Sequence, residues 1–188
     1  MSDTHATGGG RLRSGAPTSA VDAYVEHGRL VTAVSAFDAR KAMVQAWWTA
    51  ARAGEGAAMF AMTRADVDSL NRLARALARD AGRLLGPELE VGGRAFAVGD
   101  EVVALRADRR LALLNGSRGR VTALRMEEGA LEIEAAHGEA VVLPRRYLED
   151  GHLGWAYALT LHKGQGSTVD RAFLLGARLS TGRPATPA

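Results

Sequence analysis

The chain has 188 residues, enough for one ordinary domain or for one domain that carries a small insert. A hydrophobic fraction of 47% excludes general disorder, and the lack of cysteine excludes disulfide frameworks and thiolate metal sites. The net charge is +3, and almost every cation is arginine, which suits bidentate phosphate contacts. This composition is compatible with nucleic-acid binding, although it is equally typical of a GC-rich genome.

The two ends of the chain predict no membrane segment and no export signal. Met1 to Gly10 lack the charged start and apolar core of a signal peptide, and no apolar stretch is long enough to span a bilayer. We therefore expect a cytoplasmic location and no membrane contact. Both ends, 1–20 and 177–188, are rich in Gly, Ser, Thr and Pro and are expected to be flexible.

The first predicted elements alternate between helix and strand. A helix begins near Asp38 and stops at Gly54, and the apolar run 57–62 is typical of a strand buried on both faces of a parallel sheet. An amphipathic helix follows over about 66–85, with Thr63 and Asp66 as acceptors of a capping box. Its polar face carries Arg72, Arg75, Arg79 and Arg83.

The hydrophobic pattern then changes to alternate residues. Residues 96–105 predict two strands joined by a turn, Asn115 and Gly116 form a strong turn signal, and 131–143 predict a hairpin. Several short strands within roughly fifty residues favour a small barrel. Two longer apolar strands, 155–161 and 171–175, return the chain to the first pattern.

The segment 155–170 carries the clearest chemical signal. A buried strand opens into a turn with Gly164 and Gly166 and several polar side chains. Glycines let a backbone approach a ligand closely, and amides, hydroxyls and an ammonium suit the phosphate of a nucleotide or of a nucleic acid. From the pattern alone, a polar loop after a strand is the alternative.

Residues 160–167, Thr-Leu-His-Lys-Gly-Gln-Gly-Ser, resemble helicase motif V of superfamily-1B enzymes. These are the RecD-like helicases and the TraI/TrwC-like helicases that are fused to conjugative relaxases. The resemblance implies that Thr160 and His162 contact the backbone of single-stranded DNA. It also implies that Lys163, Gln165 and Gly166 line or support the nucleotide side.

Residues 59–71 resemble helicase motif IV, with a buried strand, an arginine at its tip and a helix that carries the pattern Val-Asp-x-Leu-Asn. The resemblance assigns Arg64 a catalytic and nucleotide-binding role, because this arginine reaches towards the γ-phosphate. A guanidinium there neutralises charge that develops on the transferred phosphoryl group. Without the resemblance, Arg64 would be a surface arginine at a helix start.

Residues 98–103 and 115–121 resemble the small SH3-like barrel that such helicases insert before motif V. In relatives this barrel helps to contain the DNA strand, which implies phosphate contacts for Arg106, Arg118 and Arg120. Solubilising surface arginines are the alternative for each. The same strands also resemble a short KOW-type motif of RNA-associated proteins, so the alternative function is a non-catalytic nucleic-acid-binding module.

We therefore predict an α/β fold: a RecA-like second lobe of the P-loop NTPase type, with a parallel sheet that a small SH3-like β-barrel interrupts. The expected divisions are a lead-in (1–20), the first part of the lobe (21–94), the barrel (95–150), the return to the lobe with motif V (151–176) and a tail (177–188).

Several parts of a complete helicase motor are absent from the sequence. There is no Gly-x-x-x-x-Gly-Lys-Ser/Thr phosphate loop, no Asp-Glu pair after a buried strand, and no final arginine motif after Gly176. No histidine spacing indicates a metal site. The resemblance implies ATP and Mg²⁺ as cofactors held mostly by a first lobe, single-stranded DNA as partner, and a first lobe on another chain as a further partner. We expect a helicase fragment that is inactive alone.

Overall fold

The computed structural model describes residues 33–136, 138–161 and 169–176. The chain forms two compact units, 1–39 and 40–188, and all the strands belong to the second. The helices are α3 (Ala36–Arg52), α4 (Arg64–Asp80) and α5 (Arg145–Glu149), with a 3-10 turn η1 (Arg109–Leu111). The strands are β1 (Ala57–Ala61), β2 (Leu85–Val91), β3 (Arg94–Val98), β4 (Glu101–Ala104), β5 (Arg118–Arg125), β6 (Ala130–Ala135), β7 (Ala140–Leu143), β8 (Leu153–Trp155), β9 (Ala158–Thr160) and β10 (Arg171–Leu175). None of the described helices is both long and apolar enough to cross a bilayer.

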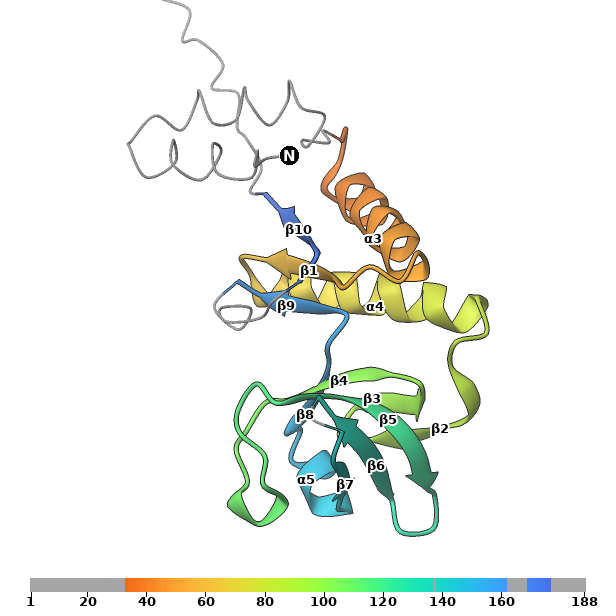
Figure 1. The fold of residues 1–188 in the computed structure, drawn as a ribbon, viewed down its shortest axis with the longest axis vertical. Coiled ribbons are helices and arrows are strands. Elements are labelled where there is room, and N and C mark those ends of the chain that lie inside the picture. Colours follow the sequence, from red (N-terminus) through yellow and green to blue (C-terminus); the bar gives the residue numbers. More distant parts are fainter. Residues whose placement is uncertain (1–32, 137, 162–168, 177–188) are drawn as a thin grey trace, which may run out of the picture. The chain divides into compact units, whose positions relative to one another are not determined.

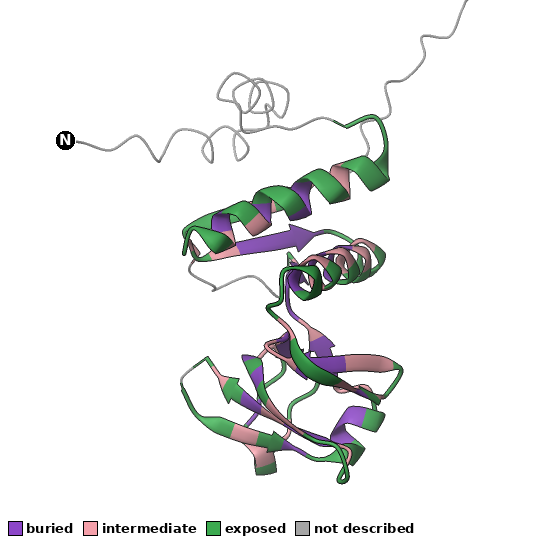
Figure 2. Ribbon diagram, turned by 90° about the vertical axis from the view of Figure 1, so that its right-hand side faces the viewer, coloured by how far each residue is buried: buried purple, intermediate pink, exposed green. Residues whose placement is uncertain are grey.

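A parallel sheet in the order β10-β1-β9 forms the α/β part of the chain (Figure 1). The central strand β1 is buried along most of its length (Figure 2). Met59 and Ala61 pack in one apolar cluster with Leu70 of α4, whereas Ala58 and Phe60 belong to a second cluster. The predicted strand that is buried on both faces of a parallel sheet is therefore confirmed.

Helix α4 begins as the sequence predicts and ends earlier. The Thr63 hydroxyl accepts the N–H of Asp66 at 3.1 Å and donates to the Asp66 carboxylate at 2.7 Å, so Thr63 is the N-cap and Asp66 contacts its hydroxyl. The predicted end near Leu85 was wrong, because the helix stops at Asp80 and Gly82 adopts a φ of +69°. Leu85 instead opens β2, a strand that the sequence pattern did not predict.

The antiparallel strands form two sheets and no closed barrel among the described residues. One sheet is the pair β2-β3, and the other has the order β7-β6-β5-β4-β8. The hairpin β6-β7 and the turn between β3 and β4 lie where the sequence predicts them. Leu89 of β2 and Phe96 of β3 share an apolar core with Val121, Leu131 and Ile133. The two sheets therefore enclose one core, although their hydrogen bonds do not close a ring.

The predicted single strand over 155–161 is two strands in two different sheets, so this prediction was wrong in detail. Strand β8 pairs antiparallel with β4, and β9 pairs parallel with β1. The two strands belong to separate sheets, so the chain leaves one ladder before it enters the other. We call residues 155–158, which make this passage, the crossing segment.

Candidate functional site at the edge of the parallel sheet

Strands β1 and β9 end side by side. Ala61 is the register partner of Thr160, and the N–H of Leu161 donates to the Ala61 carbonyl at 3.2 Å. Helix α4 starts three residues after Ala61, at Arg64. The carboxyl edge of a parallel sheet is where α/β proteins usually bind ligands. The fold therefore brings Arg64 and Thr160 to one edge, although they lie far apart in the sequence.

The start of α4 leaves the Arg64 side chain available. Arg64 is exposed and forms no ion pair with another described residue. The neighbouring carboxylate of Asp66 is already engaged, because Arg40 donates to it from Nη2 at 2.6 Å and from Nε at 3.1 Å. The Thr63 hydroxyl, and then Arg40, lower the pKa of Asp66, so this carboxylate stays ionised and bound within the protein.

Of the residues predicted from motif V, the structure describes only Thr160. It lies half-buried at the last position of β9. His162, Lys163, Gln165 and Gly166 lie outside the described residues.

The three arginines predicted to contact DNA from the antiparallel strands differ in their surroundings. Arg118 is half-buried and donates to the Ala156 carbonyl at 3.4 Å. Arg120 donates to Glu101 at 2.7 and 3.0 Å, and this bond raises the pKa of Arg120. Arg106 is exposed and forms no ion pair within the described part of the chain. The site thus has one freely presented arginine among the three.

A buried polar network joins α4 to the antiparallel strands and to the crossing segment, and the sequence did not predict it. Asp100 is fully buried and accepts from Arg75 Nε at 3.0 Å, from the Tyr157 hydroxyl at 2.6 Å and from the Ala97 N–H at 2.7 Å. Arg75 also donates to Glu88 at 2.5 Å. No local signal identifies this network, because its members come from α4, from the turn after β3 and from the crossing segment.

A side-chain amide ties α4 to β9. Asn71 is buried; its Nδ2 donates to the Ala158 carbonyl at 3.2 Å, and its Oδ1 accepts the Ala158 N–H at 2.8 Å. Asn71 ends the Val-Asp-x-Leu-Asn pattern of motif IV, and Ala158 opens the strand that leads to motif V. The two motifs are therefore joined directly as well as through β1.

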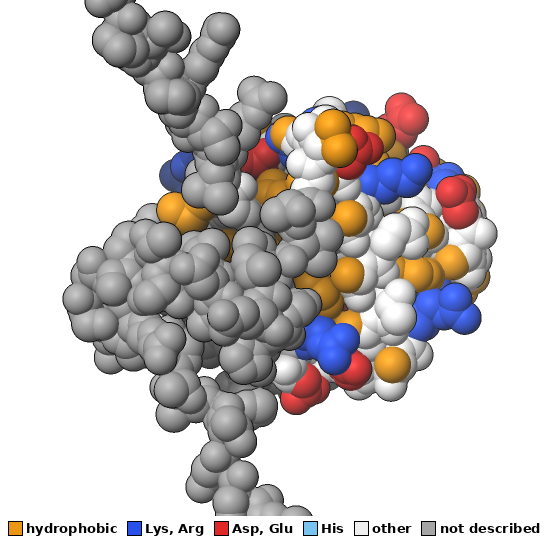
Figure 3. Space-filling model, turned by 90° about the horizontal axis from the view of Figure 1, so that it is seen from above, with side chains coloured by type: hydrophobic (Ala, Val, Ile, Leu, Met, Phe, Trp, Pro, Cys, Tyr) orange, Lys and Arg blue, Asp and Glu red, His pale blue; other side chains and the backbone are white. Residues whose placement is uncertain are grey.

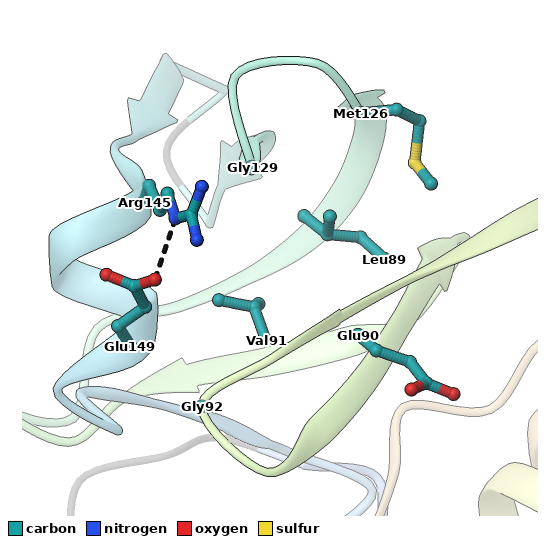
Figure 4. Close-up of a pocket in the computed structure, with 8 residues that line it drawn as sticks. All are labelled: Leu89, Glu90, Val91, Gly92, Met126, Gly129, Arg145 and Glu149. Carbon is teal, nitrogen blue, oxygen red and sulfur yellow. Dashed lines mark hydrogen bonds and ion pairs between the residues drawn. The ribbon is translucent and has the colours of Figure 1, made fainter.

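A surface hollow lies elsewhere and contains none of the predicted site residues. The tip of the β2-β3 hairpin, the β5-β6 turn and α5 form it, and the Arg145–Glu149 ion pair at 2.7 Å lies in its wall (Figure 4). Within the described ranges, no group of three or more His, Cys, Asp or Glu side chains could hold a metal ion. On the coloured part of the face in Figure 3, basic side chains form separate patches among apolar and uncharged ones. The basic side chains on that face therefore do not form one continuous stripe.

No protein-family model matches the chain. The chain is 33% identical over 170 residues to the probable conjugal transfer protein TraA of Sinorhizobium fredii, a match that covers 88% of this chain and 15% of that protein. It is 35% identical over 136 residues to the conjugal transfer protein TraA of Rhizobium radiobacter, covering 68% of this chain and 12% of that protein.

A crystal structure of the Pif1 helicase from Bacteroides in complex with ADP-AlF3 and single-stranded DNA has a similar fold. The TM-score is 0.52 at 17% identity, over 88% of this chain and 41% of that chain. The chain thus spans about an eighth to a seventh of the TraA proteins that it matches, and its fold is that of part of a helicase.

Proposed function

Since the chain is a superfamily-1B helicase-like segment related to the conjugal transfer TraA proteins, we propose that it is the second RecA-like lobe of an ATP-dependent DNA helicase. In this proposal it binds single-stranded DNA and contributes part of an ATP site, and it acts in the cytoplasm. A first lobe, on the same or another chain, supplies the rest of the motor.

The observation that carries the proposal is the pairing of Ala61 with Thr160. It supports a shared edge for the motif IV arginine and the motif V threonine, as a two-sided ligand site requires. The residues resemble motifs IV and V only in sequence, and their meeting at one edge is independent of that resemblance.

The donor chemistry at this edge fits a nucleotide phosphate. Arg64 presents an uncommitted guanidinium next to the N-terminus of α4, and both favour an anion. ATP with Mg²⁺, when bound, supplies the phosphoryl group and its counter-ion. Arg64 then holds its positive charge where negative charge grows during transfer. The metal ligands belong to the first lobe in this proposal, and Lys163, Gln165 and Gly166 keep the nucleotide-side role that the resemblance implies.

The DNA side of the site uses hydrogen-bond donors rather than a broad basic surface. The Thr160 hydroxyl, at the end of β9, donates to a backbone phosphate, and His162 keeps the DNA-contacting role that the resemblance implies. Arg106 adds a charge contact from the antiparallel strands, which we propose correspond to the SH3-like insert over about 95–150. Arg118 and Arg120 reach DNA only if they leave their present partners.

Fluorescence anisotropy with a labelled single-stranded oligonucleotide, across a salt series, tests the proposal. We expect binding that weakens with salt and that Thr160→Ala combined with His162→Ala abolishes. Thr49→Ala on α3 is the matched control, because it removes an exposed threonine hydroxyl away from the sheet edge. Duplex DNA should bind less tightly.

Two other outcomes point elsewhere. A preference for RNA that maps to residues 96–145 alone would favour the non-catalytic nucleic-acid-binding module. No binding at low salt by a folded chain would mean that the similarity to helicases reflects ancestry without a retained DNA contact.

A further inference from the structure

Helix α4 carries Arg64 at its first position and two inward-facing polar residues farther along, the buried Asn71 and the partly buried Arg75. Positions four residues apart lie on one face of a helix. On this face, Asn71 contacts Ala158, and Arg75 contacts Asp100, which in turn holds Tyr157. One helix face is therefore hydrogen-bonded to Ala158 directly and linked to Tyr157 through Asp100.

The contact of Asn71 is unusual because it replaces a neighbouring strand. In the order β10-β1-β9, no described strand pairs with the outer side of β9. A buried backbone N–H or carbonyl without a partner is costly, so an edge next to a helix needs another donor and acceptor. The Asn71 amide supplies both to a single residue, Ala158, at 2.8 and 3.2 Å.

This arrangement fixes the register of the strand. If β9 slid by one residue, every side chain would change to the opposite face of the sheet, and the outer-side N–H and carbonyl groups would no longer meet the Asn71 amide. Tyr157 resists the same slide, because its hydroxyl bonds to the fully buried Asp100 at 2.6 Å. Thr160 lies two residues beyond Ala158, so its place beside Ala61 depends on these two contacts.

We infer that Asn71 is a positioning residue for Thr160, assisted by Asp100, which bonds both to Arg75 and to Tyr157. Asn71 sets where the end of β9 lies relative to the helix that carries Arg64, and so it sets the geometry between the DNA-side and nucleotide-side groups. The consequence for DNA and nucleotide binding rests on the proposed function. The claim that Asn71 sets the position of the end of β9 rests on the hydrogen bonds alone.

The test compares Asn71→Leu, which removes both hydrogen bonds at similar volume, with Asn71→Ser, which is smaller and admits water. Ile133→Val is the matched control, because it weakens the core of the antiparallel strands without touching α4 or the crossing segment. Each full-length variant is measured for denaturant stability, for amide hydrogen exchange and for affinity towards single-stranded DNA. The informative amide is Leu161, which bonds to Ala61 and not to Asn71.

We expect the Asn71 variants to speed exchange at Leu161 and to weaken DNA binding by about tenfold or more, since a misplacement of about 1 Å has large effects at a site. Ile133→Val should leave both unchanged, and the denaturant measurement gives the loss of stability of each variant for comparison. If Asn71→Leu does not fold, Asn71→Ser still provides the comparison.

Unchanged exchange at Leu161 in the folded Asn71→Ser protein would overturn the inference. A uniform rise of exchange that Ile133→Val reproduces would also overturn it, because that is the result of a general loss of stability. If the unmodified chain binds no single-stranded DNA while Leu161 still responds to Asn71, the proposed function fails and the positioning of the strand end stands.

Discussion

Asp100 shows how this chain tolerates a buried charge. Its side chain has no exposed surface, and removing a carboxylate from water costs several kcal/mol unless charged and hydrogen-bonding partners replace the water. Arg75, Tyr157 and the Ala97 N–H supply those partners. Arg75 also lies 5.1 Å from the centre of the Trp155 ring. The network therefore joins a helix, a turn and the crossing segment at one residue.

The same network makes stability depend on alkaline pH. Burial, and then the Asp100 carboxylate, raise the pKa of Tyr157 above its ordinary value. The unfolded chain loses this proton near pH ~10, whereas the folded chain retains it. The contribution of Tyr157 is thus fully present below that pH and is lost as the pH rises towards the folded pKa.

We therefore predict that Tyr157→Phe lowers the free energy of unfolding at neutral pH by about 1.5–3 kcal/mol, the range for a hydrogen bond to a charged group. It should also flatten the fall in stability above pH ~10. Urea denaturation at several pH values measures both effects. Tyr147→Phe is the control: burial raises the pKa of Tyr147 as well, but its hydroxyl bonds to the Arg106 carbonyl and not to a carboxylate. An equal alkaline response in the two variants would contradict the role of Asp100.

At the scale of elements, the sequence pattern predicted those strands and helices whose signals are local. The continuous apolar run of β1, the helical spacing of α4 and the turn at Asn115 and Gly116 all led to correct predictions. Strand β2 was missed because Gly86 and Pro87 interrupt its pattern and Leu84 and Leu85 continue the helical spacing.

The candidate site was predictable in part for the same reason. The sequence proposes Arg64 and Thr160 as site residues because they lie in short ordered motifs, and their roles stay predictions. The Asn71–Ala158 and Arg75–Asp100 contacts join residues distant in sequence, so no motif indicates them. Arg75 looked like one of four surface arginines, and its side chain is only 11% exposed. Only the fold shows that Asp100 lies opposite it.

One turn in the antiparallel region depends on the absence of a side chain. Gly99 has a φ of +99°, and a Cβ there would lie 2.4 Å from the Arg83 carbonyl oxygen. Gly116 has nearly the same conformation, with a φ of +96°, but a Cβ there would meet nothing within 4 Å. A comparison of alanine substitutions at the two glycines therefore separates the cost of backbone strain from the cost of a steric clash.

We predict that Gly116→Ala costs about 1–3 kcal/mol from strain alone, and that Gly99→Ala costs clearly more because the Arg83 carbonyl has to move. Thermal unfolding of the two variants side by side measures the difference. Equal losses would mean that the chain between α4 and β2 adjusts without cost, and that the close approach at Gly99 does not stabilise the junction.

At the scale of the whole molecule, the crossing segment connects the antiparallel strands to the parallel sheet. The Ala156 N–H donates to the Glu101 carbonyl at 2.8 Å, and the Ala156 carbonyl accepts from Arg118. With Tyr157 and Ala158 held by Asp100 and Asn71, residues 156–158 each bond to another element. The crossing segment is therefore hydrogen-bonded to other elements at three consecutive residues.

The proposed division of the ATP site gives the last prediction. The sequence has no phosphate-binding loop, and it matches only 15% of the length of the S. fredii TraA protein. We expect the chain alone to show no ATP turnover above background, and a polypeptide that joins it to the first lobe of a TraA relative to show turnover. In that longer protein, Arg64→Ala should lower kcat by about 10³–10⁵, as for other arginines that stabilise phosphoryl transfer.

Arg72→Ala is the matched control for this experiment, because Arg72 is an exposed arginine on the same helix, away from the sheet edge. A phosphate-release assay at saturating ATP, with and without single-stranded DNA, gives kcat for both variants. Turnover by the 188-residue chain alone would show that it holds a complete site. Equal activity of the Arg64 and Arg72 variants would remove Arg64 from the ATP site while leaving the DNA contact of Thr160 to be judged by its own binding data.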